Sequence, residues 1–251
     1  MAQGLRVIGN YLSPFVRKVL VFLELKQVEY EIDPIVPFAG NDEFSRLSPL
    51  RRVPVLIDGA VVLNDSSVIC QYLEDKYPMP ALFPRDIAER AQARWLEEYA
   101  DTHLADLLTG KLFYQIAVRR RLFQEPTDDA VVQRARDVEI PEALDYLEDL
   151  MPEDDFLFGA LSIADISIAS YFRTAGFVQY VIDAARWPLT ASLMGRVQAL
   201  PVFAKLAKLE SCLLLPVPPL DQRAALVSAG APLSSDTFGT AALRHGIPRG
   251  W

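Results

Sequence analysis

Two short stretches of the chain carry residues whose types and spacing could bind a small peptide-like ligand. In the first, Pro54 precedes a short apolar strand, and an Asp58-Gly59 turn joins that strand to a second one. A cis bond between Val53 and Pro54 would keep the amide and carbonyl of Val53 out of an ordinary β-ladder. These groups would then be free to pair with an extended ligand, as in strand addition.

The second stretch, Asp65-Ser66, follows the second strand and opens a helix. The first amides of a helix have no partner within it, and together with the helix dipole they favour a carboxylate. The two stretches therefore predict a surface that holds an extended, anionic ligand largely through backbone groups.

Hydrophobic periodicity predicts the elements that position these stretches. The first part of the chain has a β-α-β order followed by β-β-α, which predicts an α/β domain over residues 1–78. Its expected strands cover residues 5–8, 28–33, 55–57 and 61–63, and its expected helices cover residues 13–26 and 66–77.

Beyond a proline-rich linker at residues 77–85, strand signals fade and helical patterns remain. We expect an all-α domain over residues 87–211, with a kink at Pro141. Its predicted helices cover residues 87–123, 127–151, 161–183, 189–199 and 202–209. Residues 212–251 form a C-terminal extension, whose prolines and small residues from 215 onward predict little regular structure.

Three motifs, in this order, resemble those of the soluble, cytosolic glutathione transferase family. Residues 11–19 (YLSPFVRKV) resemble the entry to the first helix in its serine-type branches, residues 52–67 its hairpin and following helix, and residues 161–166 the capping box of its helical domain. The resemblance covers roughly residues 5–211. It implies a thioredoxin-like N-terminal domain that binds glutathione, followed by an all-helical C-terminal domain.

The resemblance implies that a hydroxyl group near the first helix holds the glutathione thiolate. Ser13 is the favoured residue, because a hydroxyl donor and the helix dipole both stabilise thiolate over thiol. Tyr11 is the alternative, since other branches of the family use a tyrosine at the end of the first strand. The purely structural alternatives are that Ser13 only caps the helix and that Tyr11 packs between domains.

The rest of glutathione would be held by the two stretches described first. Val53 and Pro54 would clamp its backbone, and Arg52 would meet its glycyl carboxylate or simply face solvent. Ser66 would hold the γ-glutamyl carboxylate. Asp65 would face the ammonium, although the family more often has a glutamate there; the alternative is an ordinary helix cap.

Three further predictions concern the helical domain and the second substrate. Asp101 would reach the same ammonium across a homodimer interface, or belong to a solvated helix face. Phe15, together with Phe38 and the helix at 87–123, would line an apolar pocket for a small hydrophobic electrophile. Ser162 and Asp165 form a capping box, which serves folding and not chemistry.

Charge and composition exclude several classes of function. The formal net charge of −8 argues against a nucleic-acid partner, and no apolar run is long enough to span a membrane. The two cysteines, Cys70 and Cys212, are too few for a disulfide framework, which favours a reducing, cytoplasmic location. No cluster of side chains predicts a metal site, so glutathione is the expected co-substrate without a metal.

The sequence therefore predicts a detoxifying glutathione transferase, in which the thiolate held by Ser13 attacks an electrophile. Conjugation, isomerisation, dehalogenation and peroxide reduction all remain open. A serine instead of a cysteine at position 13 argues against mixed-disulfide chemistry. The alternative is a non-enzymatic interaction module of the same fold, with weak affinity for glutathione.

The extension is expected to be either a lid across the active-site mouth or a mobile tail. Its prolines, together with Phe238 and Trp251, favour the lid.

Overall fold

The computed structural model describes residues 4–214, 219–240 and 243 of the 251-residue chain. These residues form two compact units. Unit 1 holds the described residues up to Pro80 and those from Pro201 onward, and unit 2 holds Ala81–Leu200. The sequence predicts domain boundaries at 78, 87 and 211, whereas the contacts group the described residues from Pro201 onward with the N-terminal part.

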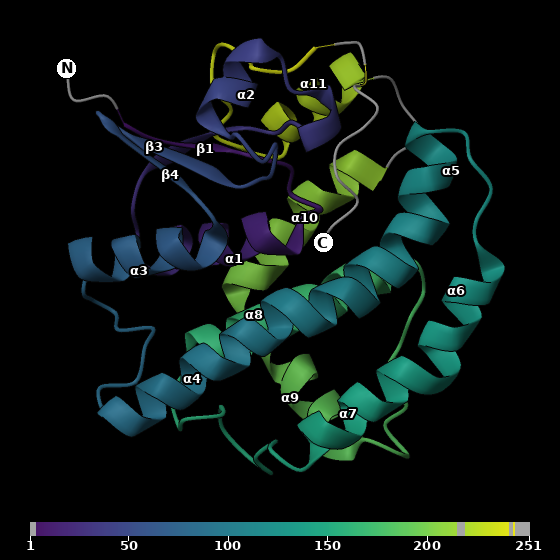
Figure 1. Ribbon diagram of the computed structural model, residues 1–251. Helices are drawn as coiled ribbons and strands as arrows, with labels where there is room; N and C mark the ends of the chain where they lie inside the picture. Colours follow the sequence, from purple (N-terminus) through teal and green to yellow (C-terminus); the bar gives the residue numbers. More distant parts are fainter. Residues whose placement is uncertain (1–3, 215–218, 241–242, 244–251) are drawn as a thin grey trace. The chain divides into compact units, whose positions relative to one another are not determined.

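Unit 1 contains a four-stranded mixed sheet (Figure 1). Its strands are β1 (Leu5–Ile8), β2 (Tyr30–Asp33), β3 (Val55–Asp58) and β4 (Val61–Asn64), in the order β2-β1-β3-β4. β2 runs parallel to β1, and β3 runs antiparallel to both β1 and β4. The four predicted strands are confirmed, although β2 begins two residues later than predicted.

The helices of unit 1 begin close to where the sequence places them. α1 (Pro14–Leu25) starts with a proline, whose missing N–H is not needed in the first turn, and packs against α3 (Ser66–Lys76). A short 3₁₀-helix, η1 (Pro37–Ala39), and α2 (Asp42–Leu47) fill the connection from β2 to β3. α10 (Pro201–Leu214) packs on α1 through a buried ion pair, 2.6 Å from Arg17 Nε to Glu210 Oε1.

Unit 2 is entirely helical, as predicted. Its central contact joins α8 (Ile163–Gly176), most of whose residues are buried, to the π-helical segment η2 (Ala100–Val118). The predicted helix at 87–123 is a continuous helical run, but the predicted helix at 161–183 is too long, because α8 already ends at Gly176. The remaining elements are α4 (Ile87–Tyr99), α5 (Arg119–Leu122), α6 (Asp129–Arg134), η3 (Ala135–Glu139), α7 (Ile140–Glu148) and α9 (Pro188–Gln198).

The capping box at the start of α8 is present. The Asp165 carboxylate is buried and accepts hydrogen bonds from Ser162 N at 2.9 Å, Ser162 Oγ at 2.7 Å and Leu157 N at 3.0 Å. Within the ranges given above, no helix is both long and apolar enough to cross a bilayer.

The prediction of little regular structure in the extension is wrong for residues 219–228, which form helix α11 (Pro219–Ser228). Its Ala224-Ala225-Leu226 run suits a helix, and Leu226 is buried. After α11 the chain runs along β2, with a parallel bridge between Ile32 and Leu233. Trp251, on which the predicted lid partly depended, lies outside the described residues.

Candidate functional site

One end of the sheet in unit 1 gathers the residues predicted to bind glutathione. Val55 lies in register with Ile8 on one side and with Asn64 on the other. β1 and β4 both end here and lead into α1 and α3, while β3 begins here directly after Val53-Pro54. The starts of both helices and the proposed clamp therefore share one place, which we call the sheet corner (residues 9–13, 53–54 and 64–66).

Gly9 allows the elements of the sheet corner to approach one another closely. Its φ of +152° is one that residues with side chains rarely adopt. A Cβ at this position would lie 2.5 Å from Val16 Cγ2 and 3.2 Å from Val53 Cβ. Because residue 9 has no side chain, both the first turn of α1 and residue 53 can pack closely against its backbone.

Ser13 is the N-cap of α1 and keeps one hydrogen-bonding function unused. Its Oγ accepts from Val16 N at 3.4 Å, and its own amide donates to Asn10 O at 3.0 Å. None of the described residues accepts the Ser13 hydroxyl hydrogen. The half-buried hydroxyl therefore caps the helix as an acceptor and can still donate to a ligand.

Tyr11 lies only two residues away but is in a different environment. Its side chain is 1% exposed, and its hydroxyl has no hydrogen-bond partner among the described residues. Burial raises the pKa of the phenol, and the nearby Glu24 and Cys212 raise it further. The phenol is therefore enclosed and held strongly in its neutral form.

The Val53-Pro54 peptide bond is cis, as the predicted clamp requires. Among the described residues, nothing hydrogen-bonds to the amide or the carbonyl of Val53. The preceding residue is fixed by Ser48, whose buried hydroxyl accepts from Arg52 N and donates to Arg52 O, both at 2.9 Å. The Arg52 side chain itself is exposed.

The start of α3 combines a capped backbone with an unused hydroxyl. Asp65 is the N-cap, with Oδ1 accepting from Ser67 N at 2.9 Å and from Val68 N at 3.3 Å. Ser66 is 2% exposed, and its Oγ has no partner among the described residues. A buried polar atom without a partner is costly, so this hydroxyl is a candidate contact for a bound ligand.

The remaining predicted residues lie in different units. Phe15 is the second residue of α1 in unit 1 and is half-buried. Asp101 lies in unit 2, in the first turn of η2, where its Oδ1 accepts from Tyr171 Oη at 2.9 Å. Asp101 is therefore tied into its own helical unit rather than being a freely solvated carboxylate.

Sequence reasoning missed two residues that shape the sheet corner. Gly9 gave no motif of its own. Lys18 is charged, yet it is 1% exposed and its Nζ lies 3.1 Å from Ser67 Oγ, joining α1 to the start of α3. Only the flanking apolar run Val19-Leu20-Val21 could have indicated that this turn of α1 is buried on all sides. In the part of the chain that the structure describes, no group of three or more metal-ligating side chains comes together.

Comparisons with known proteins agree with this arrangement. Residues 7–81 match the family model of the glutathione S-transferase N-terminal domain. A probable maleylacetoacetate isomerase from Vibrio cholerae is 29% identical over 221 residues, which are 82% of this chain and 96% of that protein. Glutathione S-transferase Z1 from Arabidopsis thaliana is 39% identical over 92 residues, which are only 36% of this chain and 42% of that protein.

A solved structure extends the likeness to most of the fold. The crystal structure of a glutathione S-transferase from Rhodospirillum rubrum F11 superposes with a TM-score of 0.75 at 26% identity, covering 86% of this chain and 94% of that one. The fold is thus a thioredoxin-like domain with an all-α domain. The family model over residues 7–81, the relatives and this structure together support a likeness to the glutathione transferase family.

Proposed function

We propose that this protein is a glutathione transferase that binds glutathione at the sheet corner and activates its thiol through Ser13. The names of its relatives support glutathione transferase activity with glutathione as a substrate. The observation that carries the proposal is the buried hydroxyl of Ser66, which has no partner among the described residues. It lies at the same end of the sheet as the backbone of Val53, to which none of these residues hydrogen-bonds.

Glutathione fits this corner as an extended tripeptide with a carboxylate at each end. The Ser66 hydroxyl and the first amides of α3 would hold the γ-glutamyl carboxylate, and Asp65 would face the ammonium. The cysteinyl residue would pair with the backbone of Val53 beside Pro54. Arg52, which is exposed, would meet the glycyl carboxylate.

The thiol would then lie at the start of α1, where Ser13 has a hydroxyl hydrogen to donate. A free thiol with a pKa of about 8.5 is only a few per cent ionised at neutral pH. Lowering that pKa by two units requires about 2.7 kcal/mol of differential stabilisation. A hydrogen bond to a charged group contributes about 1.5–3 kcal/mol, and the helix dipole adds to it.

In the transferase reaction, the thiolate sulfur forms a bond to an electrophilic carbon of a small hydrophobic substrate. The electron pair of the broken bond leaves with the displaced group, or it is taken up with a proton where the sulfur adds to a double bond. Phe15, at the start of α1, is the proposed apolar contact for that substrate. A homodimer in which Asp101 contacts glutathione of the partner subunit, and a cytoplasmic location, belong to the same proposal.

A second candidate function is glutathione-dependent isomerisation. It is favoured by the match to a probable maleylacetoacetate isomerase, which covers nearly the whole length of that relative. The two functions share the thiolate step but differ in whether glutathione is consumed. A transferase consumes glutathione, whereas an isomerase releases it unchanged. Titration of the free thiol during turnover of an electrophile or of maleylacetoacetate therefore separates them.

The thiolate itself is tested by ultraviolet difference titration of bound glutathione in the wild type, Ser13→Ala and Tyr11→Phe. We expect the wild type to lower the pKa of the glutathione thiol. Ser13→Ala should abolish this lowering, and Tyr11→Phe should retain it. Loss of the shift in Tyr11→Phe alone would make Tyr11 the donor. An unshifted thiol in the wild type would contradict the enzymatic proposal and favour an interaction module.

A further inference from the structure

The C-terminal extension is hydrogen-bonded to the open edge of β2. Ile32 N donates to Pro232 O at 2.8 Å, and Ser234 N donates to Ile32 O at 3.0 Å. These two bonds bracket the parallel bridge between Ile32 and Leu233. The extension thus covers an edge strand that would otherwise present unpaired backbone groups.

A buried carboxylate fixes the next part of the extension. Asp33, at the end of β2, is fully buried, and burial raises the pKa of its carboxyl group. Its Oδ1 accepts from Thr237 Oγ1 at 2.8 Å, and its Oδ2 accepts from Phe238 N at 2.7 Å. Arg6 lies 3.9 Å from the same carboxylate and stacks 4.6 Å above the Phe238 ring. A buried carboxylate needs such partners, and two of them come from about 200 residues later in the chain.

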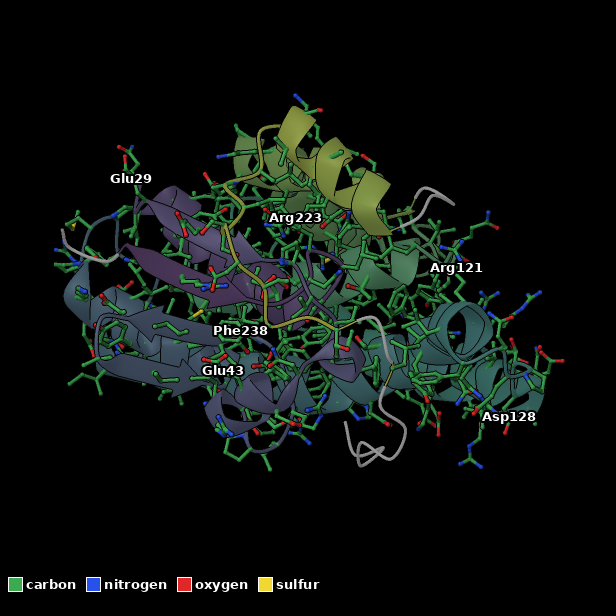
Figure 2. All side chains as sticks on the ribbon, turned by 90° about the horizontal axis from the view of Figure 1, so that it is seen from above. Glu29, Glu43, Arg121, Asp128, Arg223 and Phe238 are labelled. Atoms are coloured by element: carbon green, nitrogen blue, oxygen red, sulfur yellow. The ribbon has the colours of Figure 1, made fainter. Side chains whose placement is uncertain are left out.

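The extension then pairs with the segment that leads toward the sheet corner. Asn41 N donates to Phe238 O at 2.8 Å, and Thr240 N donates to Ala39 O at 2.7 Å, around an antiparallel bridge between Gly40 and Gly239. Phe238 lies on the extension beside the sheet of unit 1 (Figure 2). Residues 39–41 are therefore held on one side by the extension.

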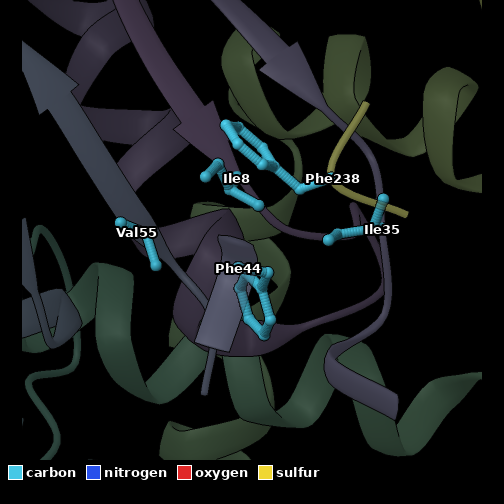
Figure 3. Close-up of a cluster of buried hydrophobic side chains, with 5 residues drawn as sticks. All are labelled: Ile8, Ile35, Phe44, Val55 and Phe238. Carbon is cyan, nitrogen blue, oxygen red and sulfur yellow. The ribbon is translucent and has the colours of Figure 1, made fainter. Parts of the chain in front are cut away.

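The ring of Phe238 completes the hydrophobic cluster beneath the corner (Figure 3). Its other buried members come from β1, the segment after β2, α2 and β3, namely Ile8, Ile35, Phe44 and Val55. Val53 packs against this cluster, as do Leu47 and Ile57. Gly40 passes so close to the Phe44 ring that a Cβ there would collide with it. One hydrophobic cluster thus joins the extension to residues 39–44 and to Val53.

We propose that residues 232–240 are a positioning element for glutathione, which hold the backbone of Val53 in place through Phe238 and Asp33. This inference rests on the proposed function, because it assigns the clamp at Val53 to glutathione. None of these residues contacts the ligand. Their effect is on the geometry of the backbone that does.

The test compares Phe238→Ala with Phe238→Leu, which keeps an apolar side chain in the cluster, and with Val227→Ala. Val227 is 60% exposed on α11, in the same extension, and serves as the matched control. Calorimetric titration gives the Kd of glutathione, and amide hydrogen exchange in the free protein reports on residues 39–53.

For Phe238→Ala we expect faster exchange at residues 39–53 and a glutathione Kd raised about tenfold. We also expect the KM for glutathione to rise while kcat at saturating glutathione is unchanged. Phe238→Leu should restore most of the affinity, and Val227→Ala should behave as the wild type.

Two results would overturn the inference in distinguishable ways. If the wild type binds glutathione and Phe238→Ala binds it equally well, the extension does not position the clamp, although the proposed function stands. If the wild type does not bind glutathione at all, the proposed function fails and this role fails with it. Should Phe238→Ala not fold, Thr237→Val decides, because it removes the hydrogen bond from Thr237 to Asp33 and should also speed exchange and raise the Kd. Unchanged exchange at residues 39–53 together with an unchanged Kd in that variant would contradict the inference.

Discussion

Two helix starts in this protein each contain one aspartate and one serine. In one of them, which we call the closed pair, the two residues hydrogen-bond to each other, and in the other, the open pair, they do not. At the start of α8 in unit 2, Asp165 accepts from both the amide and the hydroxyl of Ser162, so the pair satisfies itself. At the start of α3 in unit 1, Asp65 caps the backbone amides of Ser67 and Val68, and the buried hydroxyl of Ser66 has no partner among the described residues.

This difference separates a folding element from a candidate binding element. A closed pair contributes to the stability of its helix and has nothing left to offer a ligand. An open pair retains an unsatisfied buried hydroxyl, whose cost is offset only when something binds. The same residue types therefore support different roles, depending on where their hydrogen bonds go.

The largest expected effect is on the closed pair. Asp165→Ala leaves three donors around the start of α8 without their acceptor and should lower the free energy of unfolding by about 3 kcal/mol. Asp65→Ala, the matched change at the exposed start of α3, should cost only about 1 kcal/mol. Urea denaturation of both variants measures this, and equal losses would remove the contrast between the two starts.

The open pair should show its effect in binding. Ser66→Ala removes a hydrogen bond to the proposed carboxylate of glutathione, worth about 1.5–3 kcal/mol, so its Kd should rise about 10- to 100-fold. The free energy of unfolding without glutathione should not fall, because no bond is lost and an unsatisfied buried hydroxyl is removed. Calorimetric titration and denaturation together decide, and an unchanged Kd would assign Ser66 to the fold alone.

Ser162→Ala is the reciprocal change in the closed pair. Loss of the serine at this helix start should cost about 1 kcal/mol of stability. The Kd of glutathione should not change. A shift in Kd larger than the error of the titration would mean that the start of α8 is coupled to binding. The distinction between a folding element at α8 and a binding element at α3 would then fail.

The smallest effect concerns pH. Burial raises the pKa of Asp165, although hydrogen bonds from Leu157 and Ser162 oppose the rise. Because the folded state then binds a proton before the unfolded chain does, stability from this group increases as the pH falls through the raised pKa toward about 3.9. The difference in unfolding free energy between the wild type and Asp165→Asn should therefore shift in favour of the wild type on acidification. Denaturation at neutral and mildly acidic pH tests this, and a shift of opposite sign would contradict it.

Much of the sheet corner could be predicted because its parts are defined locally. The Asp58-Gly59 turn fixes the hairpin, and Ser13-Pro14 and Asp65-Ser66 mark the two helix starts within a few residues each. The order of strands then places these starts at one end of the sheet. The burial of Lys18 does not follow from its residue type, because a lysine is typical of a solvated helix face.

The extension shows the same limit more strongly. Its prolines predicted little regular structure, although residues 219–228 form α11, and they gave no sign of what residues 231–240 contact. Nothing near Asp33 in the sequence indicates that its partners are Thr237 and Phe238.

The sequence by itself determined the strands, the helix starts, the hairpin and the family motifs, since each depends on interactions between residues only a few positions apart. The tertiary structure alone decided that Tyr11 is enclosed, that Ser66 is buried without a partner among the described residues, and that Phe238 joins the hydrophobic cluster against which Val53 packs. Burial and long-range hydrogen bonding depend on which distant segments share the same space. A one-dimensional pattern does not contain that information until the chain is packed.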